Sequence, residues 1–129
     1  MKDKLTVWPL FEGQIVLDHA YISEITHRTG LEIHLDFGEI TKAEIIFQDF
    51  ISYTLSDEGY LTKIWHQTDK HILGKVLYIV EDSSRTDFFH QMSEQIYSHW
   101  KIVHYAVYTD NECLDILSLH EPEIKWITE

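Results

Sequence analysis

Alternating apolar and polar residues between positions 21 and 37 predict a β-hairpin in the first third of the chain. The apolar residues share one face when the loop holds three residues and Gly30 is left-handed, so that Ile25 pairs with Ile33 and Tyr21 with Phe37. A shift of one residue would move every side chain to the other face. The pattern therefore predicts both the hairpin and its register.

The second face of this hairpin carries polar side chains at even-numbered positions. Glu24 lies opposite His34 in the predicted register, which would allow a cross-strand ion pair. Charged surfaces steer and orient protein partners. The residues that we expect to form such a binding surface are Glu24, Glu32, His34 and Asp36.

Odd-numbered positions from Ala43 to Leu55 are apolar, except for Asp49. A helix through this segment has tolerable spacing, but the β-branched and aromatic side chains favour one long strand. Asp49 would then be a carboxylate on a buried face, which needs hydrogen-bonding partners unless a β-bulge turns it outwards.

The N-terminal region predicts two short strands. Leu5 to Leu10 should be an edge strand or a strand end, because Pro9 has no N–H to donate. The next strand is expected at Gln14 to Leu17. An exposed edge can pair with a second copy of the chain, so a homodimer is compatible with this pattern.

A buried strand and a long helix are predicted after residue 75, whereas no particular element is predicted for residues 60–75. Val76 to Val80 is a continuous apolar run, too short for a typical helix and suited to a strand with both faces covered. Ser84 and Asp87 have the spacing of a helix capping box. A helix from Arg85 to Trp100 should follow and pack on the sheet through an apolar stripe of Phe89, Met92, Ile96 and Trp100.

A second hairpin is predicted from Ile102 to Leu119, with Asp110-Asn111 as a two-residue loop. This register pairs Val107 with Leu114 on one face. The other face receives His104, Tyr108, Cys113 and Asp115. After His120 we expect an irregular tail whose Trp126 docks on the core.

These elements predict one α+β domain spanning residues 1–129, with a largely antiparallel sheet and one long helix at about 85–100 packed on it. The segments 76–81 and 102–109 flank that helix. They could pair antiparallel or form a right-handed parallel crossover, and the sequence leaves both arrangements open.

Composition narrows the classes of partner. The chain has 129 residues and a formal net charge of −12, which repels nucleic acid backbones and anionic membranes. One cysteine excludes an internal disulfide and favours a reducing compartment, and no apolar run is long enough for a leader or a membrane span. We therefore expect a cytoplasmic protein that binds a basic protein partner.

Candidate chemistry is sparse. None of the nine histidines has a tight metal-ligand spacing, and no phosphate-binding loop is present, so we expect neither a metal nor a cofactor. Cys113, His104 and Asp115 share a predicted sheet face, and a thiol, an imidazole and a carboxylate are the groups of a cysteine nucleophile. Cys113 faces Tyr108 and His104 faces Leu117, however, so thiol and imidazole are not opposed.

Three functions follow from these features. The first is a non-enzymatic acidic interaction domain, such as an inhibitor or immunity-type protein that binds a basic partner. The second is a small-molecule-binding domain with an aromatic pocket between the sheet and the helix. The third is a metal-assisted or cysteine hydrolase.

Overall fold

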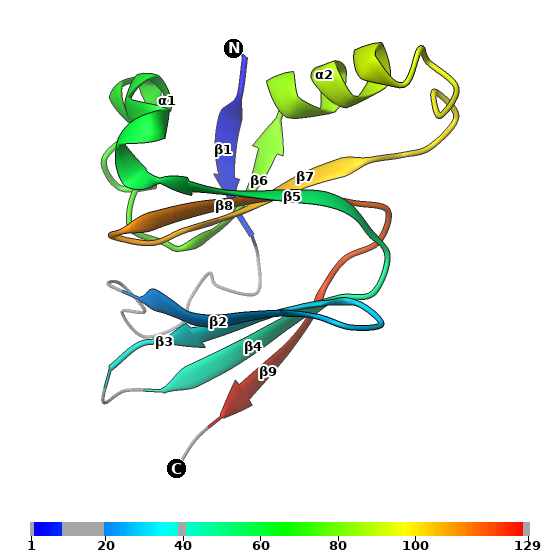
Figure 1. The fold of residues 1–129 in the computed structure, drawn as a ribbon. Coiled ribbons are helices and arrows are strands. Elements are labelled where there is room, and N and C mark those ends of the chain that lie inside the picture. Colours follow the sequence, from blue (N-terminus) through cyan, green and yellow to red (C-terminus); the bar gives the residue numbers. More distant parts are fainter. Residues whose placement is uncertain (1, 9–19, 39–40, 128–129) are drawn as a thin grey trace.

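The computed structural model describes residues 2–8, 20–38 and 41–127, and its strands form two antiparallel sheets (Figure 1). The five-stranded sheet has the order β1 (Lys4–Val7), β6 (Leu77–Glu81), β7 (Val103–Tyr108), β8 (Glu112–Ser118) and β5 (Phe50–Asp57). The four-stranded sheet has the order β2 (Tyr21–His27), β3 (Leu31–Asp36), β4 (Lys42–Phe47) and β9 (Glu123–Ile127). The helical elements are the 3₁₀ helix η2 (Glu58–Leu61), α1 (Thr62–Gln67) and α2 (Ser84–Met92).

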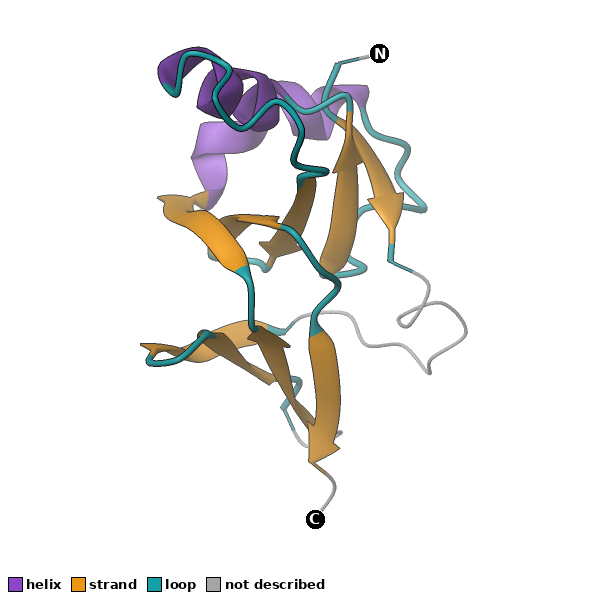
Figure 2. Ribbon diagram, turned by 90° about the vertical axis from the view of Figure 1, so that its right-hand side faces the viewer, coloured by secondary structure: helices purple, strands orange, loops and turns teal. Residues whose placement is uncertain are grey.

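The elements are arranged in three layers (Figures 1 and 2). The inner faces of the two sheets enclose the main core, in which Ile33 and Phe47 of the four-stranded sheet pack with Tyr105 and Ile116 of the five-stranded sheet. The helices lie over the outer face of the five-stranded sheet. Because one face of that sheet meets a sheet and the other meets helices, its central strands are buried on both sides.

The predicted C-terminal hairpin is confirmed, including its register. β7 and β8 pair Val107 with Leu114 and Tyr108 with Cys113 around the Asp110-Asn111 loop. β6 is an interior strand and pairs antiparallel with β7, which settles the arrangement that the sequence left open. The largely antiparallel pairing is likewise confirmed, but the strands form two sheets and not the single sheet that was expected.

The N-terminal hairpin also has the predicted register near its loop, where Ile25 pairs with Ile33 and Glu24 lies opposite His34. A bulge between Ile22 and Glu24 then shifts the pairing, so that Tyr21 meets Asp36 instead of Phe37.

The prediction of a left-handed conformation for Gly30 is wrong, because Gly30 is not among the residues with positive φ. A β-carbon at Gly30 would lie 2.8 Å from the backbone oxygen of Phe47. The position therefore needs glycine because another strand passes close to it, and not because of its φ angle.

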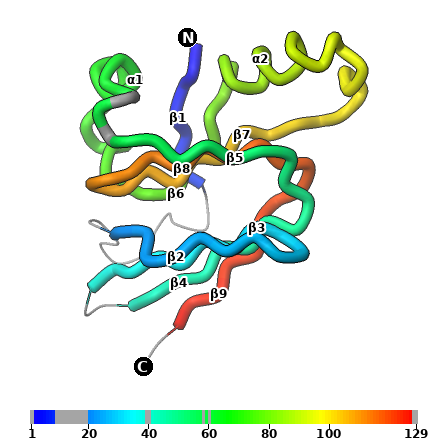
Figure 3. Tube along the Cα trace, viewed as in Figure 1, coloured from blue at the N-terminus to red at the C-terminus, as the bar shows by residue number. Residues whose placement is uncertain are grey.

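The single long strand expected from 43 to 55 is wrong. Gln48 and Asp49 form a turn at which the chain leaves β4 in the four-stranded sheet and enters β5 in the five-stranded sheet (Figure 3). Asp49 is half exposed at this turn, and its Oδ2 lies 2.6 Å from Nδ1 of His120. The break in the apolar pattern thus marks a change of sheet and not a buried carboxylate.

The long helix expected at 85–100 is also wrong. α2 begins one residue earlier than predicted, with Ser83 as its N-cap, and ends at Met92. Glu94 and Gln95 have φ angles of 52° and 65°, and this left-handed pair turns the chain out of the helix. The expected packing stripe is not buried either, since Met92 and Ile96 are exposed.

The remaining predictions concern the chain ends and residues 60–75. β1 is an edge strand, as expected, while Pro9, Leu10 and the strand expected at 14–17 lie outside the described residues. The tail expected to be irregular after His120 contains β9, which pairs with β4, and Trp126 packs against the core as predicted. The segment without a predicted element includes α1.

Candidate functional site

The candidate site is built around Asp115 on β8, whose side chain is only 1% exposed. Its Oδ1 accepts a hydrogen bond from the Tyr108 hydroxyl at 2.6 Å and lies 2.7 Å from Nε2 of His104. β7 supplies both partners, because positions 104, 106 and 108 face the same side of the sheet as Asp115. A carboxylate at this depth is stable only when such donors replace water.

The hydrogen-bonded chain continues from the sheet to α2. Nδ1 of His104 lies 2.6 Å from Oγ of Ser83, and the same oxygen accepts the backbone N–H of Thr86 as the helix N-cap. When His104 donates from Nε2 to Asp115, the Ser83 hydroxyl donates to Nδ1, and all these groups are satisfied. Ser83 therefore fixes the position of α2 over the buried Asp115.

Arg85, in the first turn of α2, provides the positive charge. Its Nη2 lies 3.3 Å from Oδ2 of Asp115, an oxygen that receives no hydrogen bond from the described residues. Arg85 is partly exposed whereas Asp115 is enclosed, and both residues line the space above the sheet. The guanidinium thus places a planar, permanently charged donor group beside that space.

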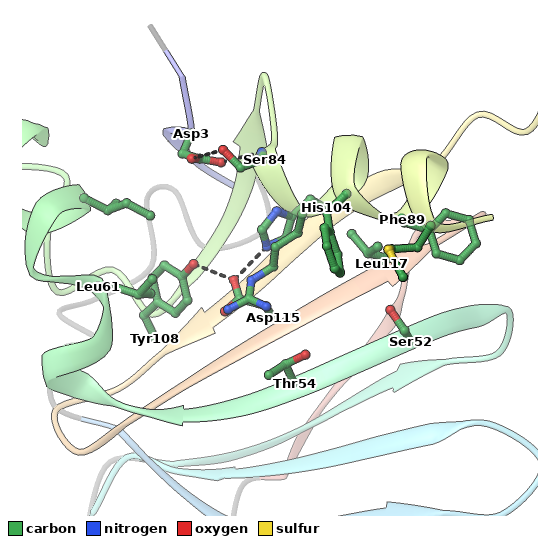
Figure 4. A pocket seen from close by; sticks show the side chains of 14 residues that line it. Asp3, Ser52, Thr54, Leu61, Ser84, Phe89, His104, Tyr108, Asp115 and Leu117 are labelled. Carbon is green, nitrogen blue, oxygen red and sulfur yellow. Dashed lines mark hydrogen bonds and ion pairs between the residues drawn. The ribbon is translucent and has the colours of Figure 1, made fainter. Parts of the chain in front are cut away.

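The space above Asp115 is a cavity of about 600 Å³ (Figure 4). The five-stranded sheet forms its floor, α2 forms one wall, and η2 with α1 contributes Leu61 and Ile64. Phe88 and Met92 of α2 line the cavity, yet they are 61% and 66% exposed. The sheet contributes Ser52, Thr54, His104, Tyr108 and Asp115 to the polar lining, and Ser84, Arg85 and Asp3 complete that lining.

The N-terminal segment closes one side of this cavity. The Asp3 carboxylate accepts hydrogen bonds from the backbone N–H and the hydroxyl of Ser84, at 2.7 and 2.6 Å. Nζ of Lys2 contacts Asp82 and Asp87, and Nε2 of Gln67 donates to the backbone oxygen of Lys2. An internal carboxylate thus already occupies the positive N-terminal end of α2.

The electrostatics of the cavity disfavour anionic ligand groups. Among the described residues, its lining carries one guanidinium, Arg85, and two carboxylates, Asp3 and Asp115, so an anionic head group would gain no net attraction. Burial, followed by the neighbouring Asp115 charge, raises the pKa of Tyr108 well above its ordinary value. The Tyr108 hydroxyl therefore remains a donor at all physiological pH values.

Two of the three candidate catalytic residues are brought together. His104 contacts Asp115 directly, whereas Cys113 is fully buried in a second core cluster with Ala106 and Tyr108 and does not line the cavity. Both ring nitrogens of His104 are occupied by Ser83 and Asp115. The imidazole is therefore not positioned to activate the Cys113 thiol.

The four predicted binding residues do share one surface, the outer face of the four-stranded sheet. His34 contacts Glu44 at 3.7 Å and Glu32 at 3.9 Å, while Glu24 accepts a hydrogen bond from Thr26, so the expected Glu24–His34 pair is replaced by other contacts. The register adds further residues to this surface. We name it the acidic face, with Glu24, Glu32, Asp36, Glu44 and Glu123 against Lys42 and Lys125.

Asp36 on the acidic face is held by specific hydrogen bonds. Its Oδ2 accepts the Tyr21 hydroxyl at 2.9 Å, and its Oδ1 accepts the backbone N–H of Gly38 at 2.7 Å. These hydrogen bonds lower the pKa of the Asp36 carboxyl, and the first of them raises the pKa of Tyr21. Asp36 thus remains charged at neutral pH.

The sequence placed the cavity floor and the helix above it, but it did not predict the contacts of Arg85 with Asp115 and of Ser83 with His104. His104, Tyr108 and Asp115 were assigned to one face from the hairpin register alone. Arg85 was predicted only as the first residue of a helix. The sequence signal for these missed contacts was Asp115 itself, because a carboxylate on a strand with buried neighbours requires a nearby cation or several hydrogen-bond donors.

Within the described ranges, no group of three or more histidine, cysteine or acidic side chains could hold a metal ion. The described helices include none that is long and apolar enough to cross a membrane. Comparison with protein-family models, with curated proteins and with solved structures found no match.

Proposed function

We propose that this protein binds a small, uncharged amphipathic molecule in the cavity between α2 and the five-stranded sheet. The observation that carries the proposal is the hydrogen-bonded chain from Ser83 through His104 and Asp115 to Arg85, which fixes one guanidinium in a cavity that also has apolar lining from Phe88 and Met92. A few fixed polar groups within apolar walls are typical of small-molecule sites.

The ligand's chemistry follows from the lining. Arg85 offers N–H donors, so the polar end of the ligand should carry an acceptor such as a carbonyl or hydroxyl oxygen. Ser52 and Thr54 can add hydrogen bonds from β5. The apolar body would cover Phe88 and Met92, two large side chains that are otherwise left in water.

A series with one tail and three head groups tests this proposal. Octanamide, octanoate and octylamine are titrated into the protein by isothermal calorimetry. We expect octanamide to bind most tightly, because the carboxylate meets Asp3 and Asp115 and the ammonium meets Arg85. Equal affinity of all three compounds would show that Arg85 does not distinguish their head groups, and it would overturn the proposal.

Variants then locate the binding. Arg85→Met should abolish the preference for octanamide, whereas Arg85→Lys should retain part of it. Glu81→Gln, an exposed change on the end of β6, serves as the matched control and should bind like the unchanged protein. Thermal unfolding of each variant confirms that it is folded before binding is compared.

A second candidate function is binding of a basic protein through the acidic face. Its support is the charge on that face, where five carboxylates, Glu24, Glu32, Asp36, Glu44 and Glu123, accompany two lysines. Such a surface attracts basic partners in a salt-dependent way.

Charge-reversal variants test whether a partner binds the acidic face itself or responds only to the net negative charge of the chain. Glu32→Lys with Glu44→Lys changes the acidic face, and Glu81→Lys with Glu94→Lys makes the same change in charge at exposed positions elsewhere. A specific partner captured from lysate should be lost with the first pair and retained with the second. Loss with both pairs would mean that net charge alone holds the partner.

A further inference from the structure

A second cavity, of about 460 Å³, lies on the other side of Phe89 from the first. The turn between β4 and β5 forms one wall, and the segment after α2 forms the other. Its lining consists of Gln48, Asp49, Phe50, Ile51, Phe89, Tyr97, Trp100 and Leu119. No step of the proposed small-molecule function uses this cavity.

Aromatic rings dominate this lining. Phe89 and Tyr97 are stacked with ring centroids 5.9 Å apart, and Tyr97 and Trp100 are stacked at 4.2 Å. Phe50 contributes a ring from the opposite wall. Phe50, Tyr97 and Trp100 are each only half-buried, so they retain surface for a ligand.

Among the described residues that line the second cavity, Asp49 carries the one charged side chain, a carboxylate. Its Oδ2 lies 2.6 Å from Nδ1 of His120, which holds the carboxylate in place at the cavity. Leu119 N–H and the Ser118 hydroxyl both donate to the Asp49 backbone oxygen, and they fix the turn itself. The carboxylate is therefore supported from the strand connection beside it.

This lining discriminates among ligand classes. An anion would be repelled by Asp49, and a sugar would find few polar partners beyond Asp49 and Gln48. A cation with an alkylated surface suits both the aromatic rings and the carboxylate, since aromatic faces attract cations and the carboxylate adds a direct charge interaction. The chain's net charge of −12 also raises the local concentration of cations.

We propose that the second cavity binds an alkylated ammonium ion between its aromatic rings and Asp49. Choline and a trimethylated lysine side chain share this chemistry. The proposal is independent of the ligand that occupies the cavity above Asp115.

Choline and its uncharged carbon analogue, 3,3-dimethylbutan-1-ol, form a matched pair of probes. Both are titrated into the ¹⁵N-labelled protein while the indole N–H signal of Trp100 and the side-chain amide of Gln48 are followed. We expect choline to shift both signals saturably and the analogue to bind much more weakly. Equal binding of the two, or no shift with choline, would overturn the proposal.

Variants assign the two components of the site. Trp100→Leu should weaken choline binding by roughly three- to thirtyfold, the range for a cation over an aromatic face. Asp49→Asn should weaken it by about two- to fivefold, as expected for a partly exposed charge pair. Glu44→Gln removes a carboxylate on the acidic face and should change nothing. Unaltered affinity in both Trp100→Leu and Asp49→Asn would place choline elsewhere and contradict the assignment.

Comparing a trimethyl-lysine peptide with choline shows whether the ammonium ion belongs to a protein side chain or to a free metabolite. Tighter binding of a peptide with one trimethyl-lysine than of choline would assign the site to a protein side chain. The reverse order would assign it to a free metabolite. Octanamide binding should persist in Asp49→Asn, which keeps this test separate from the proposal for the first cavity.

Discussion

At the scale of single residues, Asp115 is the most constrained side chain of the candidate site. It is enclosed and contacts His104, Tyr108 and Arg85, so its charge is balanced by one cation and two further donors. Removing one member of such a group leaves the others without a partner in a medium that solvates charges poorly. The site and the stability of the fold therefore depend on the same residue.

Asp115→Asn should lower the free energy of unfolding by roughly 2 to 4 kcal/mol, because it removes the charge opposite Arg85 and disturbs the bonds to His104 and Tyr108. Urea denaturation followed by circular dichroism measures this change. Asp49→Asn is the matched control, since Asp49 is 52% exposed and its pair with His120 should contribute less than about 1 kcal/mol. Equal losses in the two variants would contradict a buried charge at Asp115.

The tyrosines should titrate in separate groups. Burial, followed by the charge of Glu121, raises the pKa of Tyr105 to about 12, and burial raises that of Tyr108 further. Their protonated forms stabilise the fold fully below pH 10, the ordinary tyrosine value, and this contribution declines as the pH rises beyond it. Alkaline titration by phenolate absorbance should show a late group that Tyr108→Phe reduces by one. Titration of all phenols together near pH 10, with the protein still folded, would argue against this burial.

At the scale of elements, α2 has no buried residue and is held mainly by its N-terminal end. Ser83 and Arg85 connect that end to the sheet, whereas Phe88 and Met92 line the cavity and remain largely exposed. A helix with this arrangement can leave a cavity beneath it, because its apolar residues do not fill the space against the sheet.

Met92→Gln should therefore cost less than about 0.5 kcal/mol of stability, since an exposed side chain loses little packing. The same change should weaken octanamide binding, because the ligand's apolar body would cover Met92. Calorimetric titration and urea denaturation on one protein sample separate the two effects. A large loss of stability would show that Met92 packs more closely than its exposure indicates.

The loop between β2 and β3 gives a second prediction at this scale. Gly30→Ala should destabilise the protein by roughly 1 to 3 kcal/mol, because the new methyl group would approach backbone atoms that cannot move freely. Gly59→Ala meets only the Asp57 side chain at 3.4 Å and should have a much smaller effect. Thermal melts of the two variants compare them directly, and similar melting temperatures would argue against the close approach at Gly30.

Local patterns predicted some elements well and others badly, for physical reasons. Both hairpins were predictable because alternation and short loops fix the register near the turn, which also placed His104 and Asp115 on one face. The end of α2 was not predictable, because residues 93–100 contain no glycine or proline that would mark the left-handed conformation of Glu94 and Gln95. The contact of Arg85 with Asp115 was not predictable either, because the two residues lie 30 positions apart in the chain.

At the scale of the whole molecule, the chain changes sheets three times: between β1 and β2, at Gln48-Asp49, and between β8 and β9. Hydrogen bonds from Ser118 and Leu119 to Asp49 join the last two of these connections. Apolar residues resume at odd-numbered positions after Gln48-Asp49, so the sequence resembled one strand. Both proposed cavities lie on the helical side of the five-stranded sheet, whereas the acidic face lies on the opposite side of the molecule.

The most direct test of the central claim is a ¹H–¹⁵N correlation spectrum recorded during titration with octanamide. We expect saturable shifts of the Arg85 side-chain Nε–H and of the backbone signals of Thr54, Phe88 and Met92, while the signals of Glu32 and Glu44 stay in place. Shifts confined to the four-stranded sheet, or an unmoved Arg85 signal at saturation, would contradict a ligand site between α2 and the five-stranded sheet.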